Sequence, residues 1–275
     1  MTNGGRGFDL VASDLDGTLL STSDSISART QSAIRRVLDS GAFFVFATGR
    51  PPRWIEPVAE ETGHRSYAVG SNGAVILDLS INDDHERVLH TSLVSPDDAL
   101  AIVAAIRSVS PRAAFAIDGP QGFGHEPNYV PSWAIPADYR IEPVEALLNT
   151  SILKVLFKDP DISADRYAAL GEAVAGIGSL TFGSAVPVPG ATTLLEVMAP
   201  NVSKATALQW ICEREGIASK RVLAFGDMPN DAEMLAWAGH GVAMANAHDT
   251  IKSLANQVTL SNDDHGVAAV IESLF

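Results

Sequence analysis

The chain has 275 residues, of which 46% are hydrophobic and 19% charged, and its formal net charge at pH 7 is -14. This composition is typical of a folded globular protein, and the acidic charge argues against nucleic acid or an anionic membrane surface as a partner. Cys212 is the only cysteine, which excludes an intrachain disulfide and a cysteine-based zinc cage. Because the sequence has no signal-peptide pattern and no apolar stretch long enough to span a bilayer, we expect a soluble, cytoplasmic protein.

The first part of the chain alternates between short apolar runs and segments with helical spacing. Residues 8–13 form an apolar run that ends at acids and a glycine, as a buried strand does before a loop. Residues 25–41 predict a helix with a serine at its start and Gly41 at its end. Further strands are predicted within residues 42–50 and 66–78, and a helix begun by prolines over residues 51–63.

The same rhythm returns at the end of the chain. Helices are predicted over residues 202–216, 232–239, 249–255 and 266–275, and strands followed by loops within residues 221–231 and 240–247. Strands that alternate with helices favour a parallel sheet covered on both faces. We therefore predict an α/β fold, with a doubly wound, Rossmann-like core formed by residues 1–90 and 200–275.

The intervening residues 91–199 have a different texture. They predict helices near both ends of the stretch and several strands, including a pair that can form a hairpin, around a Gly/Pro-rich loop at residues 118–136. We interpret this stretch as an inserted α+β domain.

The predicted strand ends carry the polar side chains that are suited to chemistry, in the motifs "DLDGT", "ATGR" and "GDMPND". In a doubly wound sheet, ligands bind at the carboxyl ends of the strands. Asp14 and Asp16 lie two residues apart where a strand ends, and a hard divalent cation such as Mg²⁺ makes two nearby carboxylates tolerable. Asp227 and Asp231 offer further oxygen ligands.

A second group of residues is suited to phosphate. Thr48 and the main-chain amides of Gly49 and Arg50 lie at a predicted strand-to-helix turn, an arrangement that suits phosphate oxygens, and Lys204 adds a cation. Each residue alone has a simpler explanation, since Asp before Gly usually forms a turn and a lone Lys is usually solvated. Their joint occurrence at successive strand ends favours a catalytic site.

The order of "DLDGT", "ATGR", "SK" and "GDMPND" resembles the four motifs of the haloacid dehalogenase-like superfamily, and the late insertion resembles its Cof-type phosphatases with a C2-type (IIB) cap. The resemblance covers nearly the whole chain. It implies that Asp14 is the nucleophile that becomes an aspartyl phosphate and that Asp16 is the general acid and base. It also implies that Thr48 and Lys204 hold the phosphate.

The same resemblance implies the metal site. Asp227 matches the metal-binding acid, Asp231 supports the metal shell, and Asn230 touches phosphate. The main-chain carbonyl of Asp16 is a further expected Mg²⁺ ligand, beside Asp14.

Three other residues are weaker candidates for substrate contact. Arg50 is expected either to lie near the phosphate or to pair with an acid of the inserted domain, although an Arg at a helix start is more often a surface residue. Asn72 belongs to "SNG", which is primarily a turn signal. His125 lies in the Gly/Pro-rich loop of the insertion, where a solvated histidine is the commoner case.

These observations predict a Mg²⁺-dependent phosphomonoester hydrolase that acts on a small phosphorylated metabolite, with a sugar phosphate as the favoured class. The alternatives are a phosphotransferase or mutase that uses the same aspartyl phosphate, and a non-catalytic sensor of a phosphorylated ligand. Neither the physiological substrate nor the oligomeric state follows from the sequence.

Overall fold

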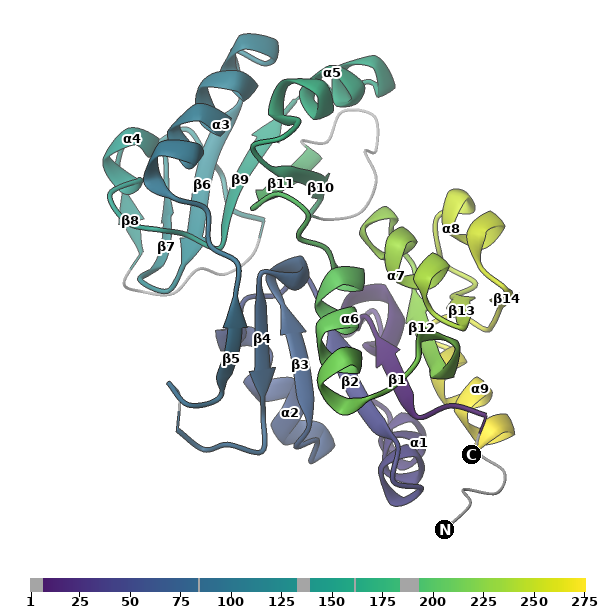
Figure 1. The fold of residues 1–275 in the computed structure, drawn as a ribbon. Helices are drawn as coiled ribbons and strands as arrows, with labels where there is room; N and C mark the ends of the chain where they lie inside the picture. The colour runs from purple at the N-terminus through teal and green to yellow at the C-terminus, as the bar shows by residue number, and fades with distance from the viewer. Residues whose placement is uncertain (1–6, 84, 133–138, 161, 184–192) are drawn as a thin grey trace. The chain divides into compact units, whose positions relative to one another are not determined.

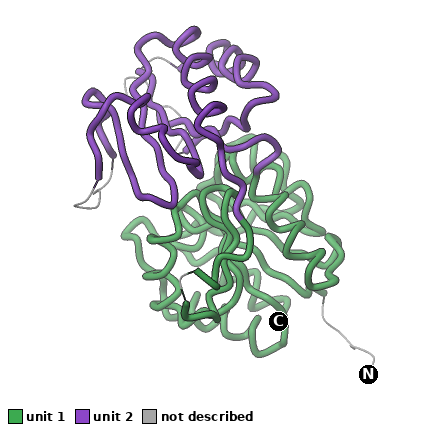
Figure 2. Tube along the Cα trace, turned by 60° about the vertical axis from the view of Figure 1, so that its left-hand side comes forward, with its two compact units in different colours: residues 1–90, 203–275 green, residues 91–202 purple. Residues whose placement is uncertain are grey.

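The computed structural model describes residues 7–83, 85–132, 139–160, 162–183 and 193–275. The chain divides into two compact units, coloured separately in Figure 2. Unit 1 consists of Met1–His90 and Ser203–Phe275, and unit 2 consists of Thr91–Val202. In the described ranges, no helix is both long enough and apolar enough to cross a bilayer.

Unit 1 contains an eight-stranded sheet with the order β14-β13-β12-β1-β2-β3-β4-β5 (Figure 1). The strands are β1 (Leu10–Ser13), β2 (Phe43–Ala47), β3 (Tyr67–Gly70), β4 (Val75–Asp78), β5 (Val88–Thr91), β12 (Val222–Gly226), β13 (His240–Ala243) and β14 (Gln257–Val258). Pairing is parallel from β14 through β3, and β4 returns antiparallel to β3.

The central strands of unit 1 are buried because helices cover both faces of the sheet. Every residue of β1, β3 and β12 is buried, as expected for parallel strands that read as continuous apolar runs. The helices are α1 (Ala28–Asp39), α2 (Glu56–Thr62), α6 (Lys204–Glu215), α7 (Ala232–Trp237), α8 (Asp249–Leu254) and α9 (Gly266–Leu274). Helix α1 packs against α9, and α6 packs against α7. The α/β fold class predicted from the sequence is confirmed.

The register of the sheet positions the site. Strand β1 lies between β2 and β12, and Ser13 is paired with Phe46 on one side and Phe225 on the other. From β1 the chain continues to β2 and β3 on one side of the sheet, and it later returns to form β12, β13 and β14 on the other side. This change of direction at β1 is the switch point at which doubly wound sheets bind ligands. The residues that follow β1, β2 and β12 therefore emerge at one edge of the sheet.

Unit 2 contains a six-stranded sheet with the order β10-β11-β9-β6-β7-β8. Its strands are β6 (Ala114–Gly119), β7 (Gly122–His125), β8 (Arg140–Ile141), β9 (Lys154–Asp159), β10 (Ser179–Phe182) and β11 (Thr193–Met198). Pairing is antiparallel except between β7 and β8. Its helices are α3 (Pro96–Val109), α4 (Val144–Leu147) and α5 (Ala164–Val174), and they share the larger of two apolar clusters with the sheet.

One expectation about unit 2 is wrong. The stretch predicted as a Gly/Pro-rich loop contains β7, which forms a hairpin with β6 through a pairing of Gly119 with Gly122. Gly122 has a φ of 100°, which a residue with a side chain rarely adopts. Because glycine supplies both the turn and half of the positions of β7, the strand lacks the alternation by which a strand is recognised.

Candidate active site

The turn after β1 is shaped by the acid that it faces. The Leu20 amide donates to the Leu15 carbonyl at 2.8 Å, which closes a turn one residue wider than a helical turn. Within it, Gly17 has a φ of 79°, and a Cβ at this position would lie 2.4 Å from Asp227 Oδ2. Only glycine fits this position, because any side chain would displace the Asp227 carboxylate.

A buried cluster of opposite charges lies at the carboxyl ends of β1 and β12. Lys204 Nζ donates to Asp14 Oδ1 at 2.6 Å and to Asp231 Oδ1 at 2.7 Å. All three side chains are almost fully buried. Lys204 is the first residue of α6, and its position is set by Ser203, whose side chain caps the helix by accepting from an amide in the first turn.

Asp227 completes the cluster. One carboxylate oxygen each from Asp14, Asp227 and Asp231 lies within 4.8 Å of the other two. Asp227 Oδ1 accepts from Thr18 Oγ1 at 2.8 Å, and the amide of Asp227 donates to Asp231 Oδ2 at 3.0 Å. Gly226 allows this approach, since a Cβ there would lie 2.5 Å from the Asp231 Cβ.

The charges of this cluster do not balance unless a further cation binds beside Lys204. Three carboxylates and one ammonium sum to -2, and a divalent cation would neutralise them. Burial, and then repulsion by Asp231, raises the pKa of Asp227 to about 7. Burial also raises the pKa of Asp14 well above its usual range, although Lys204 opposes the shift. Oxygen ligands with this charge are the set that Mg²⁺ prefers, so the residues fit the metal predicted from the sequence.

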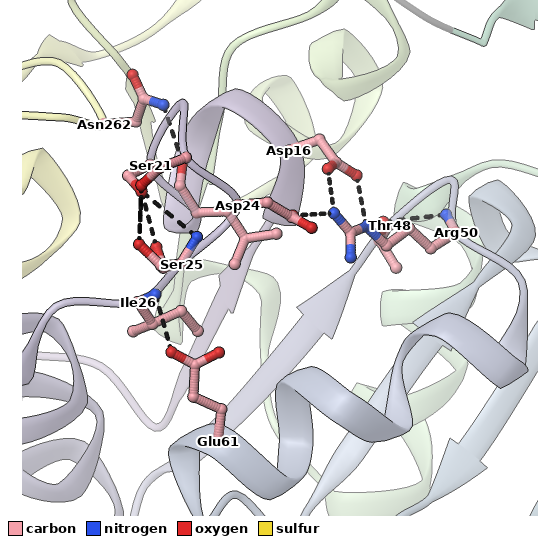
Figure 3. Close-up of polar contacts among 11 residues, drawn as sticks. Asp16, Ser21, Asp24, Ser25, Ile26, Thr48, Arg50, Glu61 and Asn262 are labelled. Carbon is pink, nitrogen blue, oxygen red and sulfur yellow. Dashed lines mark hydrogen bonds and ion pairs between the residues drawn. The ribbon is translucent and has the colours of Figure 1, made fainter. Parts of the chain in front are cut away.

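The Asp16 side chain points to Arg50, as Figure 3 shows. The Arg50 guanidinium donates to Asp16 Oδ2 at 2.9 Å and to Asp16 Oδ1 at 2.6 Å, and it also donates to Asp24 Oδ1 at 2.6 Å. The Arg50 amide donates to Thr48 Oγ1 at 3.0 Å. The structure therefore joins Asp16, which follows β1, to the loop that follows β2.

The loop that carries Asp24 is held by polar contacts, which are also drawn in Figure 3. Asp24 has a left-handed backbone with a φ of 56°. The hydroxyls of Ser21 and Ser25 lie 3.0 Å apart, and the Ile26 amide donates to Glu61 Oε1 at 3.1 Å. These contacts hold the loop in place, and with it Asp24, whose carboxylate is the second acceptor of Arg50.

Asn72 and Asn230 meet at the same edge of the sheet. Asn230 Nδ2 donates to Asn72 Oδ1 at 3.0 Å. A Cβ at Gly49 would lie 3.3 Å from Asn72 Oδ1, so the carboxamide of Asn72 lies close to the loop that follows β2.

His125 belongs to unit 2, whereas the acidic cluster belongs to unit 1. It is the last residue of β7, where its ring stacks on Tyr139 with a centroid separation of 5.4 Å. Its Nδ1 lies 2.7 Å from the carbonyl oxygen of Glu126. Its predicted role in substrate contact stays a prediction.

Two residues of the site were missed by sequence reasoning. Asp24 had no signal, because its contact with Arg50 depends on a strained loop. Asn246 Nδ2 donates to the Gly17 carbonyl at 2.8 Å. It follows β13, so the strand-end rule that selected Asp14 and Asp227 applies to Asn246 as well.

The fold and the acidic site together define a class of hydrolase. The sequence profile of the haloacid dehalogenase-like hydrolases matches residues 11–271, and the chain belongs to this family. Over 272 residues, it is 30% identical to 5-amino-6-(5-phospho-D-ribitylamino)uracil phosphatase YitU of Bacillus subtilis, and the match covers 97% of each chain. It is 31% identical over 266 residues to YcsE, a second 5-amino-6-(5-phospho-D-ribitylamino)uracil phosphatase of the same organism, and the match covers 95% of this chain and 94% of YcsE.

Solved structures agree with this assignment. A haloacid dehalogenase-like hydrolase from Bacillus subtilis superposes with a TM-score of 0.79 at 25% identity, covering 97% of this chain and all of that one. A protein from Streptococcus mutans superposes with a TM-score of 0.81 at 24% identity, covering 97% of this chain and 98% of that one, and shows the shared fold. The chain is therefore an enzyme, a phosphatase of the haloacid dehalogenase-like family, as its motifs predicted.

Proposed function

We propose that this enzyme is a Mg²⁺-dependent phosphomonoester hydrolase that acts on a small phosphorylated metabolite through an aspartyl phosphate on Asp14. The observation that carries the proposal is the buried cluster in which Lys204 bridges Asp14 and Asp231, with an Asp227 oxygen within 4.8 Å of the other two acids. One ammonium group among three buried carboxylates leaves an excess of negative charge, which a divalent metal ion would neutralise.

Asp14, Asp227, Asp231 and the main-chain carbonyl of Asp16 are the residues that we assign to the metal. Bound there, Mg²⁺ would neutralise charge on the phosphate, which allows an anionic carboxylate to approach an anionic ester. The remaining chemistry belongs to the side chains of the protein.

In the first step, an oxygen of the Asp14 carboxylate forms a bond to phosphorus while the bond from phosphorus to the ester oxygen breaks. Asp16 donates a proton to the departing oxygen, which leaves as an alcohol. In the second step, Asp16 takes a proton from a water molecule whose oxygen attacks the same phosphorus. The bond to Asp14 breaks, and inorganic phosphate is released. Lys204, Thr48 and the Gly49 amide are assigned to the phosphate oxygens, where they stabilise developing charge.

The activities of two relatives support a substrate class. YitU and YcsE are phosphatases of 5-amino-6-(5-phospho-D-ribitylamino)uracil, which carries its phosphate on a sugar-derived chain. We propose a phosphorylated sugar or sugar alcohol for this enzyme as well, and this uracil derivative is the first compound to test. Substrate selection is assigned to unit 2, the predicted cap, with His125 as a candidate contact.

The Asp14→Asn variant tests the proposed nucleophile. We expect it to fold and to lose Mg²⁺-dependent release of inorganic phosphate from p-nitrophenyl phosphate and from a panel of phosphorylated sugars, because an amide is not a nucleophile of this kind. Asp249→Asn is the matched control, since the Asp249 side chain is 99% exposed on α8, and it should retain full turnover. Undiminished turnover in Asp14→Asn would refute the proposal. Direct measurement of free phosphate also separates hydrolysis from transfer to another acceptor.

A further inference from the structure

The turn between β3 and β4 contains two buried residues, Ser71 and Asn72, in an unfavourable backbone conformation. Ser71 and Asn72 both have left-handed backbones, with φ of 48° and 55°, a region that residues with a Cβ rarely adopt. Among the described residues, Ser71 Oγ and Asn230 Oδ1 are buried atoms without a hydrogen-bond partner. Strain and unmet polar groups persist where surrounding structure enforces them, and they gather at functional sites.

This turn contacts two of the segments assigned to phosphate, the loop after β2 and the start of α6. The Asn72 amide donates to the Thr48 carbonyl at 3.0 Å, which ties the turn to the loop after β2. On the other side, a Cβ at Gly73 would lie 2.2 Å from the Ser203 carbonyl oxygen. The backbone of the turn therefore contacts the start of α6, immediately before Lys204.

The side chain of Asn72 reaches a third loop. Its Oδ1 accepts from Asn230 Nδ2 at 3.0 Å, and Asn72 is only 2% exposed. A primary amide nitrogen carries two hydrogens. The contact thus uses one hydrogen of Asn230 Nδ2, hinders rotation of the Asn230 amide, and leaves the second hydrogen for another acceptor.

We propose that Asn72 is a positioning residue for phosphate binding: it holds the Asn230 carboxamide so that the second Nδ2 hydrogen meets a phosphate oxygen. This inference rests on the proposed function, since it takes a phosphoryl group as the ligand. The strained turn maintains this arrangement, because Asn72 contacts both the loop after β2 and Asn230, and Gly73 lies against the start of α6.

Two substitutions separate positioning from backbone stability. Asn72→Gly and Asn72→Ala both remove the carboxamide, but only glycine adopts a φ of 55° without strain. We expect both variants to lose about tenfold in kcat/KM and to raise the Kd for inorganic phosphate by a similar factor, the equivalent of one hydrogen bond. Asn72→Gly should nevertheless melt at a higher temperature than Asn72→Ala. If the turn acted on stability alone, Asn72→Gly would keep wild-type kinetics and phosphate affinity, and that result would overturn the inference.

A double-mutant cycle tests the contact itself. Asn230→Ala should also lose about tenfold, and the Asn72→Gly/Asn230→Ala double variant should lose little more than either single variant, because all of them remove the same contact. Additive losses of about a hundredfold would contradict positioning through Asn230. Phosphate binding, measured by calorimetry with Mg²⁺ present, needs no turnover. A failure of the positioning role is therefore distinguishable from a failure of the nucleophile test with Asp14→Asn.

Discussion

At the scale of single residues, Arg50 links the proposed general acid to a loop outside the sequence motifs. The guanidinium donates twice to Asp16 and once to Asp24. Paired hydrogen bonds between an arginine and a carboxylate fix the plane of the carboxyl group as well as its position. Because both Asp16 oxygens accept from Arg50, one of these contacts has to open before Asp16 carries a proton. We therefore expect Arg50, anchored by Asp24, to keep the Asp16 carboxyl at the site and to release one of its oxygens to the ester oxygen.

Substitution of Arg50 should reveal this role through the leaving group. Arg50→Gln should lower kcat/KM about 100-fold for an alkyl phosphate, because its leaving alcohol needs the proton of a well-placed acid. The loss should be much smaller for p-nitrophenyl phosphate, whose leaving group needs little protonation. Arg221→Gln is the control, since Arg221 makes a similar paired contact with Asp9 at distances of 2.8 Å. Equal losses for the two substrates would show that Arg50 does not act through Asp16.

His64 makes the stability of the fold depend on pH. Its ring is buried against Phe46, with a centroid separation of 4.4 Å, and burial lowers its pKa to about 4. The unfolded chain has an ordinary histidine pKa of about 6.5. Between these values the unfolded state binds more protons, so the free energy of unfolding falls as pH decreases from about 6.5 to 4.

The His64→Phe variant should lack this part of the pH dependence. We expect the free energy of unfolding of the wild type to fall by about 3 kcal/mol more than that of the variant between pH 7 and pH 4, since each unit of pKa shift corresponds to about 1.4 kcal/mol. Urea denaturation at a series of pH values measures the difference. His85→Gln, at an exposed position, should follow the wild-type curve. Parallel curves for His64→Phe and the wild type would contradict a neutral buried ring.

At the scale of elements, the turn after β1 requires glycine for two separable reasons. Gly17 has a φ of 79° and lies against Asp227, whereas Gly63, at the end of α2, has a φ of 66° and has no atom within 4 Å of an added Cβ. An alanine at either position carries the cost of a left-handed backbone, about 1 to 2 kcal/mol. Only at Gly17 would the methyl group also displace a proposed metal ligand.

Gly17→Ala and Gly63→Ala therefore form a matched pair. We expect both to lower the free energy of unfolding, and only Gly17→Ala to lose turnover at saturating Mg²⁺ by at least about 100-fold, as a misplaced site does. Chemical denaturation and steady-state kinetics measure the two effects. Equal activity of the two variants would mean that the turn tolerates a displaced Asp227.

The elements also show what could be predicted from sequence. The buried strands β1, β2 and β12 were predictable because continuous apolar runs end at polar residues, and the same ends hold Asp14, Thr48 and Asp227. The edge strands β5 and β14 were not predictable, because most of their residues are exposed and they lack a buried face to impose alternation. Asp24 escaped prediction for a related reason, since a contact made by a strained loop leaves no periodic pattern.

At the scale of the whole molecule, we expect the buried acids to couple the stability of the fold to binding of the proposed metal. Without a cation, ionisation of Asp227 above its pKa of about 7 adds a negative charge to a cluster that already holds two other acids. Its raised pKa means that the metal-free protein loses stability as pH rises from about 4 through 7. A ligand that binds only the folded state offsets this loss.

Asp227→Asn should separate stability from metal binding. We expect Mg²⁺ to raise the Tm of the wild type by a few degrees at pH 8, roughly the effect of 2 to 3 kcal/mol at a hundredfold excess over Kd. In a chelator, Asp227→Asn should melt at or above the wild type because one buried charge is gone, and Mg²⁺ should hardly shift it. Differential scanning calorimetry measures both values, with Asp249→Asn as the control. A full Mg²⁺ shift in Asp227→Asn would remove this residue from the metal site.

The pairing of β1 with β12 has a consequence for biosynthesis. Leu10 is paired with Val222, and the contact of Lys204 with Asp14 spans 190 positions of the chain. The ribosome therefore synthesises Asp14 early and must translate all of unit 2 before β12, the second neighbour of β1, exists. Until then, the nascent chain has an unpaired sheet edge at β1, and Asp14, the proposed nucleophile, has no contact with Lys204. On the proposed mechanism, activity can therefore appear only after α6 and β12 have been synthesised, and we expect a message truncated anywhere inside unit 2 to encode an inactive product.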